Sequence, residues 1–402
     1  KGKAGSPYAI CDYYDVNPYL ANDPDKRLEE FESLVERSHA AGLKVIMDYV
    51  PNHVSRDYGQ VTRTQGHPVL GDSDDKTVHW KSENDFFYYP GQSLTLPTSV
   101  PKGMKPYYEM PAMATGNNCY TPNPGVNDWY ETVKLNYGVY YQGGGEKQFD
   151  PIPDTWHKML HILLFWAGKQ VDGFRCDMAE MVPVEFWTWA IEQVKAKYPK
   201  ILFIAEVYNP HLYRDYLAAG FDYLYDKVGM YDYLRGVTSK NWAAEGITQQ
   251  WQSVDDIRDR MLYFLENHDE QRIASGFFCG RGICAEPAMI VAATLGTNPV
   301  MVYAGQELGE KGMDAEGFSG MDGRTTIFDY WSVDTIRRWR NGGKFDGKHL
   351  TKEEKKLQGF YSTLLNLCNK EKAIREGNFF DLTYANLEGV AFNEHRQYAF
   401  FR

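Results

Sequence analysis

The stretch that decides the fold is Gly173-Phe174-Arg175-Cys176-Asp177. Its apolar residues predict a short buried strand, on which Arg175 and Asp177 point to the same side because they are two residues apart. An arginine beside a carboxylate favours the ionised form of that carboxylate. An ionised carboxylate at a strand end suits covalent catalysis or the stabilisation of a cation. A structural ion pair explains this stretch at least as well when it is taken alone, so the interpretation depends on how the other strands end.

Two further apolar runs end in carboxylates. Glu206 follows the run 201–205, and Asp269 lies shortly after the run 261–265. Together with 171–177, these runs belong to a set of six short strand candidates, the others being 43–47, 221–225 and 300–303.

Helix signals stand between these runs. Helical spacing and capping residues predict helices that begin at Asp23-Pro24, Asp154 and Pro183, and further helices over roughly 284–295 and 353–370. Short apolar strands alternating with amphipathic helices predict an α/β fold whose parallel sheet is covered on both faces. Because polar residues cluster where the strands end, the pattern favours a (β/α)8 TIM barrel. A Rossmann-like sheet is disfavoured, since no glycine-rich fingerprint follows any strand.

The predicted barrel is incomplete and interrupted. A closed barrel needs eight strands, and we expect the first two to precede residue 1, so that the sequence is a piece of a longer polypeptide. Residues 54–150 show no helix–strand alternation and are rich in glycine, proline, asparagine and aromatic residues, which predicts an irregular inserted subdomain. We therefore assign 1–53 and 151–373 to the barrel, 54–150 to the insertion after its third strand, and 374–402 to the start of a C-terminal β domain.

Composition excludes several partners. The formal net charge is −11, and the sequence has neither a basic run suited to nucleic acid nor an apolar run approaching the roughly 18 residues of a membrane span. Aromatic residues make up 15% of the chain, which suits flat contacts to sugars or a tyrosine-rich core. The six cysteines form no C-x-x-C pair, so we expect free thiols and a reducing compartment. Localisation stays open between cytoplasm and periplasm.

The acids at the strand ends predict glycoside hydrolysis. In a barrel Asp177, Glu206 and Asp269 would converge over one mouth, and two carboxylates about 5 Å apart suit a retaining mechanism. Arg175 would keep Asp177 ionised as the nucleophile, whereas the apolar run before Glu206 favours the protonated form that an acid catalyst needs. The third acid can stabilise the positive charge of the transition state.

Two histidines lie at matching places. His53 follows the strand that ends at Asp48, and His268 directly precedes Asp269. Neutral imidazoles can hydrogen-bond sugar hydroxyls, or they can bind a metal ion. Because no H-x-H or H-x-x-x-H spacing supports a metal site, we expect sugar contacts and no metal at these histidines.

Four segments resemble, in order and spacing, the motifs of the α-amylase superfamily, glycoside hydrolase family thirteen. They are Asp48–His53, Gly173–Asp177, Ala205–Val207 and Phe264–Asp269. The stretch from Gly296 to Glu307 is similar to the segment around the last barrel strand of that family, and Val133–Asn136 is similar to a further, less specific motif. Any one of these motifs is weak, but four in order are specific.

The resemblance implies a role for each candidate residue. Asp177 would be the nucleophile, Glu206 the acid/base and Asp269 the transition-state stabiliser, with sugar contacts from Tyr8, His53, Arg175 and His268. The implied activity is hydrolysis of α-glucosidic bonds in starch-like glucans or malto-oligosaccharides through a covalent glycosyl-Asp intermediate. A 4-α-glucanotransferase with the same intermediate is one alternative, and a non-catalytic sugar-binding or transporter-associated relative is a remote one.

Two positions set limits on this resemblance. Many α-amylases carry Lys-His shortly after the nucleophile, whereas Met178–Met181 stands here. That departure leaves room for an oligosaccharide hydrolase or a transferase beside plain starch hydrolysis. Asn52 matches a residue that in many family members binds a structural calcium ion, and an asparagine that only fixes its own loop explains the position equally well. The chemistry itself needs no cofactor.

Overall fold

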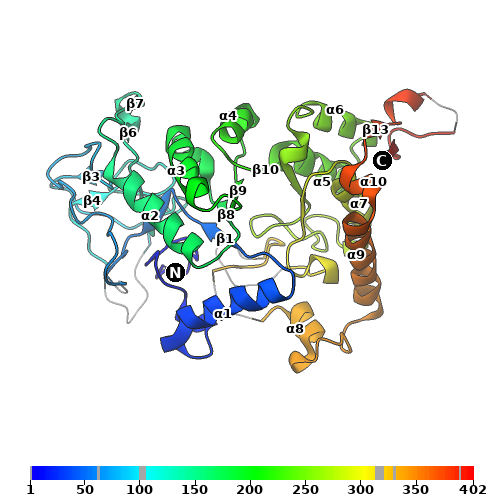
Figure 1. Cartoon of the computed structure of the whole chain (residues 1–402), viewed down its shortest axis with the longest axis horizontal. Coiled ribbons are helices and arrows are strands. Elements are labelled where there is room, and N and C mark those ends of the chain that lie inside the picture. The colour runs from blue at the N-terminus through cyan, green and yellow to red at the C-terminus, as the bar shows by residue number, and fades with distance from the viewer. Residues whose placement is uncertain (1, 61–63, 99–105, 313–320, 329–331, 389–390) are drawn as a thin grey trace. The chain divides into compact units, whose positions relative to one another are not determined.

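The computed structural model describes residues 2–60, 64–98, 106–312, 321–328, 332–388 and 391–402. The chain forms two compact units, of which the first comprises Lys1–Val207 with Leu212–Asp222, and the second comprises Tyr208–His211 with Tyr223–Arg402. Parallel strands and helices alternate along the chain in both units (Figure 1).

The first unit is organised around three parallel strands in the order β1 (Ile46–Tyr49), β8 (Gly173–Cys176) and β9 (Leu202–Ala205). In this register Asp48 lies opposite Arg175, and Cys176 lies opposite Ala205. A Cβ atom at Gly173 would come within 2.7 Å of the Leu202 carbonyl oxygen, so the close approach of β8 to β9 requires glycine. Asp177 and Glu206 therefore leave neighbouring strands at the same edge.

Four helices accompany these strands, namely α1 (Arg27–Ala40), α2 (Asp154–Gly168), α3 (Val184–Lys197) and α4 (Tyr213–Ala218). The predicted start at Asp23-Pro24 is confirmed, because the Asp23 side chain caps a 3₁₀ turn that leads directly into α1. Helix α2 buries Met159 and Leu163, and it packs against α3 (Figure 1).

The insertion contains only short two-stranded sheets in its described part. Strand β2 (His53–Ser55) pairs with β5 (Thr132–Lys134), β3 (Tyr88–Tyr89) with β4 (Ala112–Met113), and β6 (Val139–Tyr140) with β7 (Glu146–Lys147). Turns and loops connect these strands, as the missing helix–strand alternation predicts.

The second unit also has three parallel strands, β10 (Tyr223–Tyr225), β11 (Met261–Phe264) and β12 (Val300–Met301). Its helices are α5 (Asp232–Ser239), α6 (Ile247–Gln252), α7 (Glu286–Thr294), α8 (Asp334–Arg340), α9 (Lys352–Lys370) and α10 (Lys372–Glu376). A capping box between Thr351 and Glu354 fixes the start of α9, which packs against α7 (Figure 1).

All six predicted strands are present, although the first starts later than predicted. The first begins at Ile46 rather than Leu43, whose side chain is 62% exposed. Near the C-terminus, β13 (Phe380–Asp381) pairs with β14 (Phe400–Phe401), as expected for a β segment. The apolar sequence of residues 390–392 also suits a strand, but it begins outside the described residues, and residues 391 and 392 are not in a strand.

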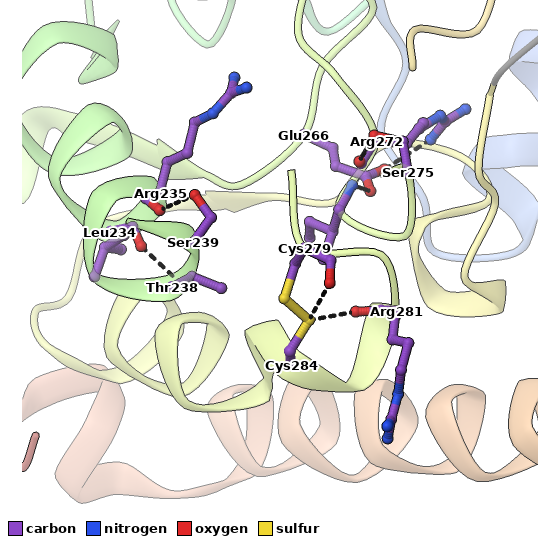
Figure 2. The surroundings of a disulfide bond; sticks show 11 residues. Leu234, Arg235, Thr238, Ser239, Glu266, Arg272, Ser275, Cys279, Arg281 and Cys284 are labelled. Atoms are coloured by element: carbon purple, nitrogen blue, oxygen red, sulfur yellow. Dashed lines mark hydrogen bonds and ion pairs between the residues drawn. A yellow bond between two sulfur atoms is a disulfide. The ribbon is translucent and has the colours of Figure 1, made fainter. Parts of the chain in front are cut away.

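The expectation of free thiols is wrong for two cysteines. Cys279 and Cys284 form a disulfide, which Figure 2 shows in the same loop region as Arg281. The 3₁₀ turn Gly282–Ala285 folds the chain back, so that the two Cα atoms are 6.6 Å apart, within reach of a disulfide. Cys11, Cys119, Cys176 and Cys368 are not part of a disulfide. In the part of the chain that the structure describes, no helix has the length and apolar character needed to cross a membrane.

Candidate active site

The guanidinium group of Arg175 contacts three carboxylates of the first unit. Arg175 Nη1 lies 2.9 Å from Asp177 Oδ1 and 2.9 Å from Asp48 Oδ1, and Arg175 Nη2 lies 2.8 Å from Glu206 Oε2. Arg175, Asp177 and Glu206 are all buried. Asp177 and Glu206 thus contact two nitrogens of the same fork, which sets the two carboxylates side by side.

The backbone holds both acids just beyond their strands. The Asp177 N–H donates to the Tyr49 carbonyl at 2.8 Å, and the Glu206 N–H donates to the Cys176 carbonyl at 3.1 Å, so the strand ladder continues through both acids. Met178 follows with a φ of +43°, a left-handed conformation that costs a bulky residue about 1–2 kcal/mol. This turn lets the Met178 N–H donate to Glu206 Oε2 at 2.8 Å.

Tyr8 closes one side of the acid cluster. Its hydroxyl donates to Asp48 Oδ2 at 2.7 Å, and the Arg175 guanidinium lies 5.8 Å from the centre of its ring. Burial, together with the nearby Asp48 carboxylate, raises the pKa of Tyr8, so the phenol stays neutral and keeps its proton for donation.

His53 is buried as a neutral imidazole. Burial lowers its pKa to about 3, and the neighbouring Lys134 charge acts in the same direction. The Asn52 side-chain nitrogen lies 3.1 Å from His53 Nδ1. An amide NH₂ can only donate, so Nδ1 accepts and the ring proton lies on Nε2. The ring also has a hydrogen bond with the Tyr8 backbone, which opposes the effect of burial on the His53 pKa.

Opposing effects act on the pKa of Asp177. Burial raises its pKa well above the ordinary value, and Glu206 and Asp48 raise it further, whereas Arg175 lowers it. Arg175 thus favours the ionised form of Asp177, as expected, while burial and the two neighbouring acids favour the protonated form. One guanidinium does not offset the loss of solvent around a carboxylate that also faces two other acids.

His268 and Asp269 belong to the second unit, in the loop that follows β11. His268 Nε2 lies 3.1 Å from Asp269 Oδ2, and the Asp269 carboxylate is 49% exposed. The Asn267 side chain accepts from the Asp269 N–H at 2.9 Å. Glu266 anchors the same loop, because its carboxylate accepts from Arg272 Nη1 at 2.8 Å and from a backbone N–H.

With this geometry in place, comparison with known proteins identifies the family. The model of the alpha amylase catalytic domain matches residues 3–344. The chain belongs to the alpha-amylase family. It is 24% identical over 398 residues to Alpha-amylase 3 of Dictyoglomus thermophilum, covering 92% of this chain and 68% of that protein.

Other family members extend the range of activities among the relatives. The alpha-1,4-glucan:maltose-1-phosphate maltosyltransferase of Cereibacter sphaeroides is 23% identical over 248 residues, or 59% of this chain and 32% of that protein. The crystal structure of an alpha-amylase from Lactobacillus plantarum shares the fold, with a TM-score of 0.54, 22% identity and coverage of 95% of this chain and 71% of that one. The chain thus spans between a third and two thirds of the length of these curated relatives.

Two residues of this alpha-amylase family site were not among the sequence candidates. Asp48 lies in β1 opposite Arg175 and binds both Arg175 and Tyr8. Its position directly after the apolar run 43–47 could have marked Asp48 as a candidate. Only the strand register shows that its carboxylate contacts the same Arg175 guanidinium as the other two acids. Lys134 is buried beside Asn52, and the less specific motif Val133–Asn136, which contains it, was the signal that could have identified it.

Proposed function

We propose that this chain is the catalytic part of a retaining glycoside hydrolase that cleaves α-glucosidic bonds of starch-like glucans or malto-oligosaccharides. The observation that carries the proposal is the fork of Arg175, which contacts Asp177 through one nitrogen and Glu206 through the other. Neighbouring carboxylates of this kind suit a double displacement, in which one acts as nucleophile and the other as acid and then base.

In the first step, Asp177 attacks the anomeric carbon while Glu206 gives its proton to the departing glycosidic oxygen. The bond between that carbon and oxygen breaks as the glycosyl-Asp177 ester forms. In the second step, Glu206 takes a proton from water, the resulting hydroxyl attacks the same carbon, and Asp177 leaves as a carboxylate. The configuration of the sugar is retained.

This sequence of steps requires the proton of the acid pair to reside on Glu206 when the attack begins. Arg175 Nη1 touches Asp177 directly, and its charge opposes the effect of burial on that carboxyl. The Met178 N–H donates to Glu206 and helps to fix its orientation toward the leaving oxygen. The pair can thus hold one proton in a defined place.

The remaining candidates would bind the sugar at the cleavage point. We assign His53 and His268 to its hydroxyl groups, and the Tyr8 ring to an apolar face of the sugar. Asp269 would stabilise the positive charge that develops on the ring.

A glucanotransferase is the second candidate. It uses the same glycosyl-Asp177 intermediate, but the 4-hydroxyl of another sugar replaces water in the second step. The similarity to the maltosyltransferase of Cereibacter sphaeroides supports this alternative. Loop shapes in the insertion would decide between water and sugar as the acceptor.

The test uses the complete protein and its Asp177→Asn variant with maltoheptaose, and product anomers are followed by NMR. We expect the variant to lose on the order of 10⁴-fold in kcat, and the wild type to release the α-anomer first. Asp25→Asn, at an exposed turn, serves as the matched control with unchanged kcat. An active Asp177→Asn or early β-anomer contradicts the mechanism. Early products longer than maltoheptaose would assign the chain to the transferases.

A further inference from the structure

Lys134 is a buried lysine whose acceptors are uncharged. It lies in β5 and is 1% exposed. Its Nζ donates to Asn52 Oδ1, and it also donates to the Met181 carbonyl oxygen at 3.0 Å. The aromatic ring of Tyr141 covers it, with the ring centre 5.5 Å away.

The three segments that meet at this amine all lead to the candidate active site. Asn52 directly precedes His53 and binds its ring. Lys134 is the strand partner of His53 in the β2–β5 ladder. Met181 lies in the 3₁₀ turn that follows Asp177 and Met178. The amine therefore ties the insertion to the loops that carry His53 and Asp177.

The residues around Asn52 do not fit a calcium ion. Calcium takes about six to eight oxygen ligands, several of them carboxylates. The family resemblance predicts that the Asn52 side-chain oxygen could bind calcium. Here that oxygen already accepts a hydrogen bond from Lys134. Among the described residues no group of three or more histidine, cysteine or acidic side chains is arranged to hold a metal ion.

We propose that the Lys134 amine takes the place of a structural metal ion in this chain, and that it is a positioning residue for His53 and Asp177. A metal ion at this position would bind the Asn52 side-chain oxygen and the Met181 carbonyl oxygen. The Lys134 Nζ contacts the same two oxygens by donating a hydrogen bond to each. Burial lowers the pKa of Lys134 to about 7. The amine keeps at least two hydrogens in either protonation state, enough for both acceptors.

The Lys134 amine differs from a bound metal ion in one measurable way, because a chelator can remove the metal ion but not the side chain. The first experiment measures the melting temperature of the complete protein in excess Ca²⁺ and in excess EDTA. We expect the two temperatures to agree. A higher melting temperature in Ca²⁺, accompanied by stoichiometric Ca²⁺ binding in calorimetry, would overturn the proposal.

The second experiment replaces the amine. Lys134→Met keeps much of the side-chain volume but donates nothing, so we expect a lower melting temperature and a fall in kcat that exceeds any change in KM. Lys147→Met, in the same insertion at an exposed surface ion pair with Glu185, is the matched control. Equal melting temperatures and equal kcat for the two variants would overturn the positioning role. The kcat arm rests on the proposed function, whereas the melting temperatures do not.

The third experiment converts the site. Lys134→Asp places a carboxylate near the Asn52 and Met181 oxygens, so that three protein oxygens, completed by water, would surround a cation. We expect Ca²⁺ to raise the melting temperature of this variant above its value in EDTA, and to leave that of Lys147→Asp unchanged. No response of Lys134→Asp to Ca²⁺ would contradict the claim that the amine occupies a cation position.

Discussion

Arg175 and Lys134 are both buried cationic side chains of the first unit, yet their surroundings differ in charge. Three carboxylates surround Arg175, whereas Lys134 donates to an amide oxygen and a carbonyl oxygen. Burial lowers the pKa of Lys134 to about 7. Arg175 is therefore buried as a cation that carboxylates compensate. Lys134 has only uncharged acceptors, and it can donate hydrogen bonds to them with or without its charge.

The comparison also separates two kinds of function. The guanidinium and its acids form a set whose proton content matters for chemistry, because burial raises the pKa of Asp177 while Arg175 opposes that effect. Lys134 connects the segments that carry Asn52 and Met181, and the positions of its hydrogen bonds matter more for this role than its charge. Four substitutions or conditions test this division.

The largest effect is expected at the guanidinium. Arg175→Met removes the one cation that Asp48, Asp177 and Glu206 share, so their mutual repulsion favours protonation of Asp177 and the nucleophile is lost. We expect kcat/KM to fall on the order of 10³-fold, or about 4 kcal/mol. Steady-state kinetics on maltoheptaose measure it. Arg175→Lys keeps the charge without the planar fork and should recover only part of the loss; wild-type activity in Arg175→Met would remove Arg175 from the mechanism.

A smaller effect is expected from Asp48→Asn, which removes one acid and keeps the shape. The Asp48 charge raises the pKa of Asp177, so its removal lowers that pKa. Asp177 then stays ionised at lower pH, and the acidic limb of the kcat/KM profile should move to lower pH. The pH–rate profiles of variant and wild type measure this shift. A limb that moves to higher pH would show that Asp48 does not act on Asp177 through its charge.

The third prediction concerns pH and Lys134. Burial lowers the pKa of this lysine from the 10.5 of a solvated lysine, as in the unfolded chain, to about 7 in the fold. Between these values the unfolded chain binds one more proton than the folded chain, so the free energy of unfolding rises with pH. We expect wild type to gain about 1.4 kcal/mol per pH unit over Lys134→Met between about pH 8 and about pH 9.5, where the folded lysine is neutral and the unfolded lysine is charged. Urea unfolding of both proteins at several pH values measures the difference, and a constant difference would show that the amine stays charged.

The smallest effect is expected at the surface. Lys147 and Glu185 form an ion pair in which both side chains are substantially exposed. Lys147→Met should change the free energy of unfolding by less than about 1 kcal/mol, because solvent screens such pairs. A loss as large as that of Lys134→Met would mean that burial is not what distinguishes the two lysines.

The elements that the sequence predicts well are those with a strong local pattern. Continuous apolar runs place β8, β9 and β11, and the Asp23-Pro24 signal places the start of α1. The acids Asp177 and Glu206 follow from their position after apolar runs. These features depend on residues close together in the chain, which one sequence can show.

The features that the sequence does not predict depend on contacts across the fold. The sharing of Arg175 between Asp48, Asp177 and Glu206 requires the register of three strands. The balance of burial and charge at Asp177 requires its full surroundings. The pairing of Cys279 with Cys284 depends on the shape of the turn between them, which the residues of that turn do not predict.

The β2–β5 ladder has a practical consequence. Ser55 pairs with Thr132, so the long segment between them leaves and re-enters the fold at adjacent points. A flexible loop whose ends are fixed together tolerates changes of length at a small entropic cost, provided that the buried Asp85, which binds Thr155 and Lys158 of α2, is kept. Protein engineers could therefore graft segments of other lengths between Ser55 and Thr132 to alter substrate preference, while Asp177 and Glu206 stay on strands that the graft does not touch.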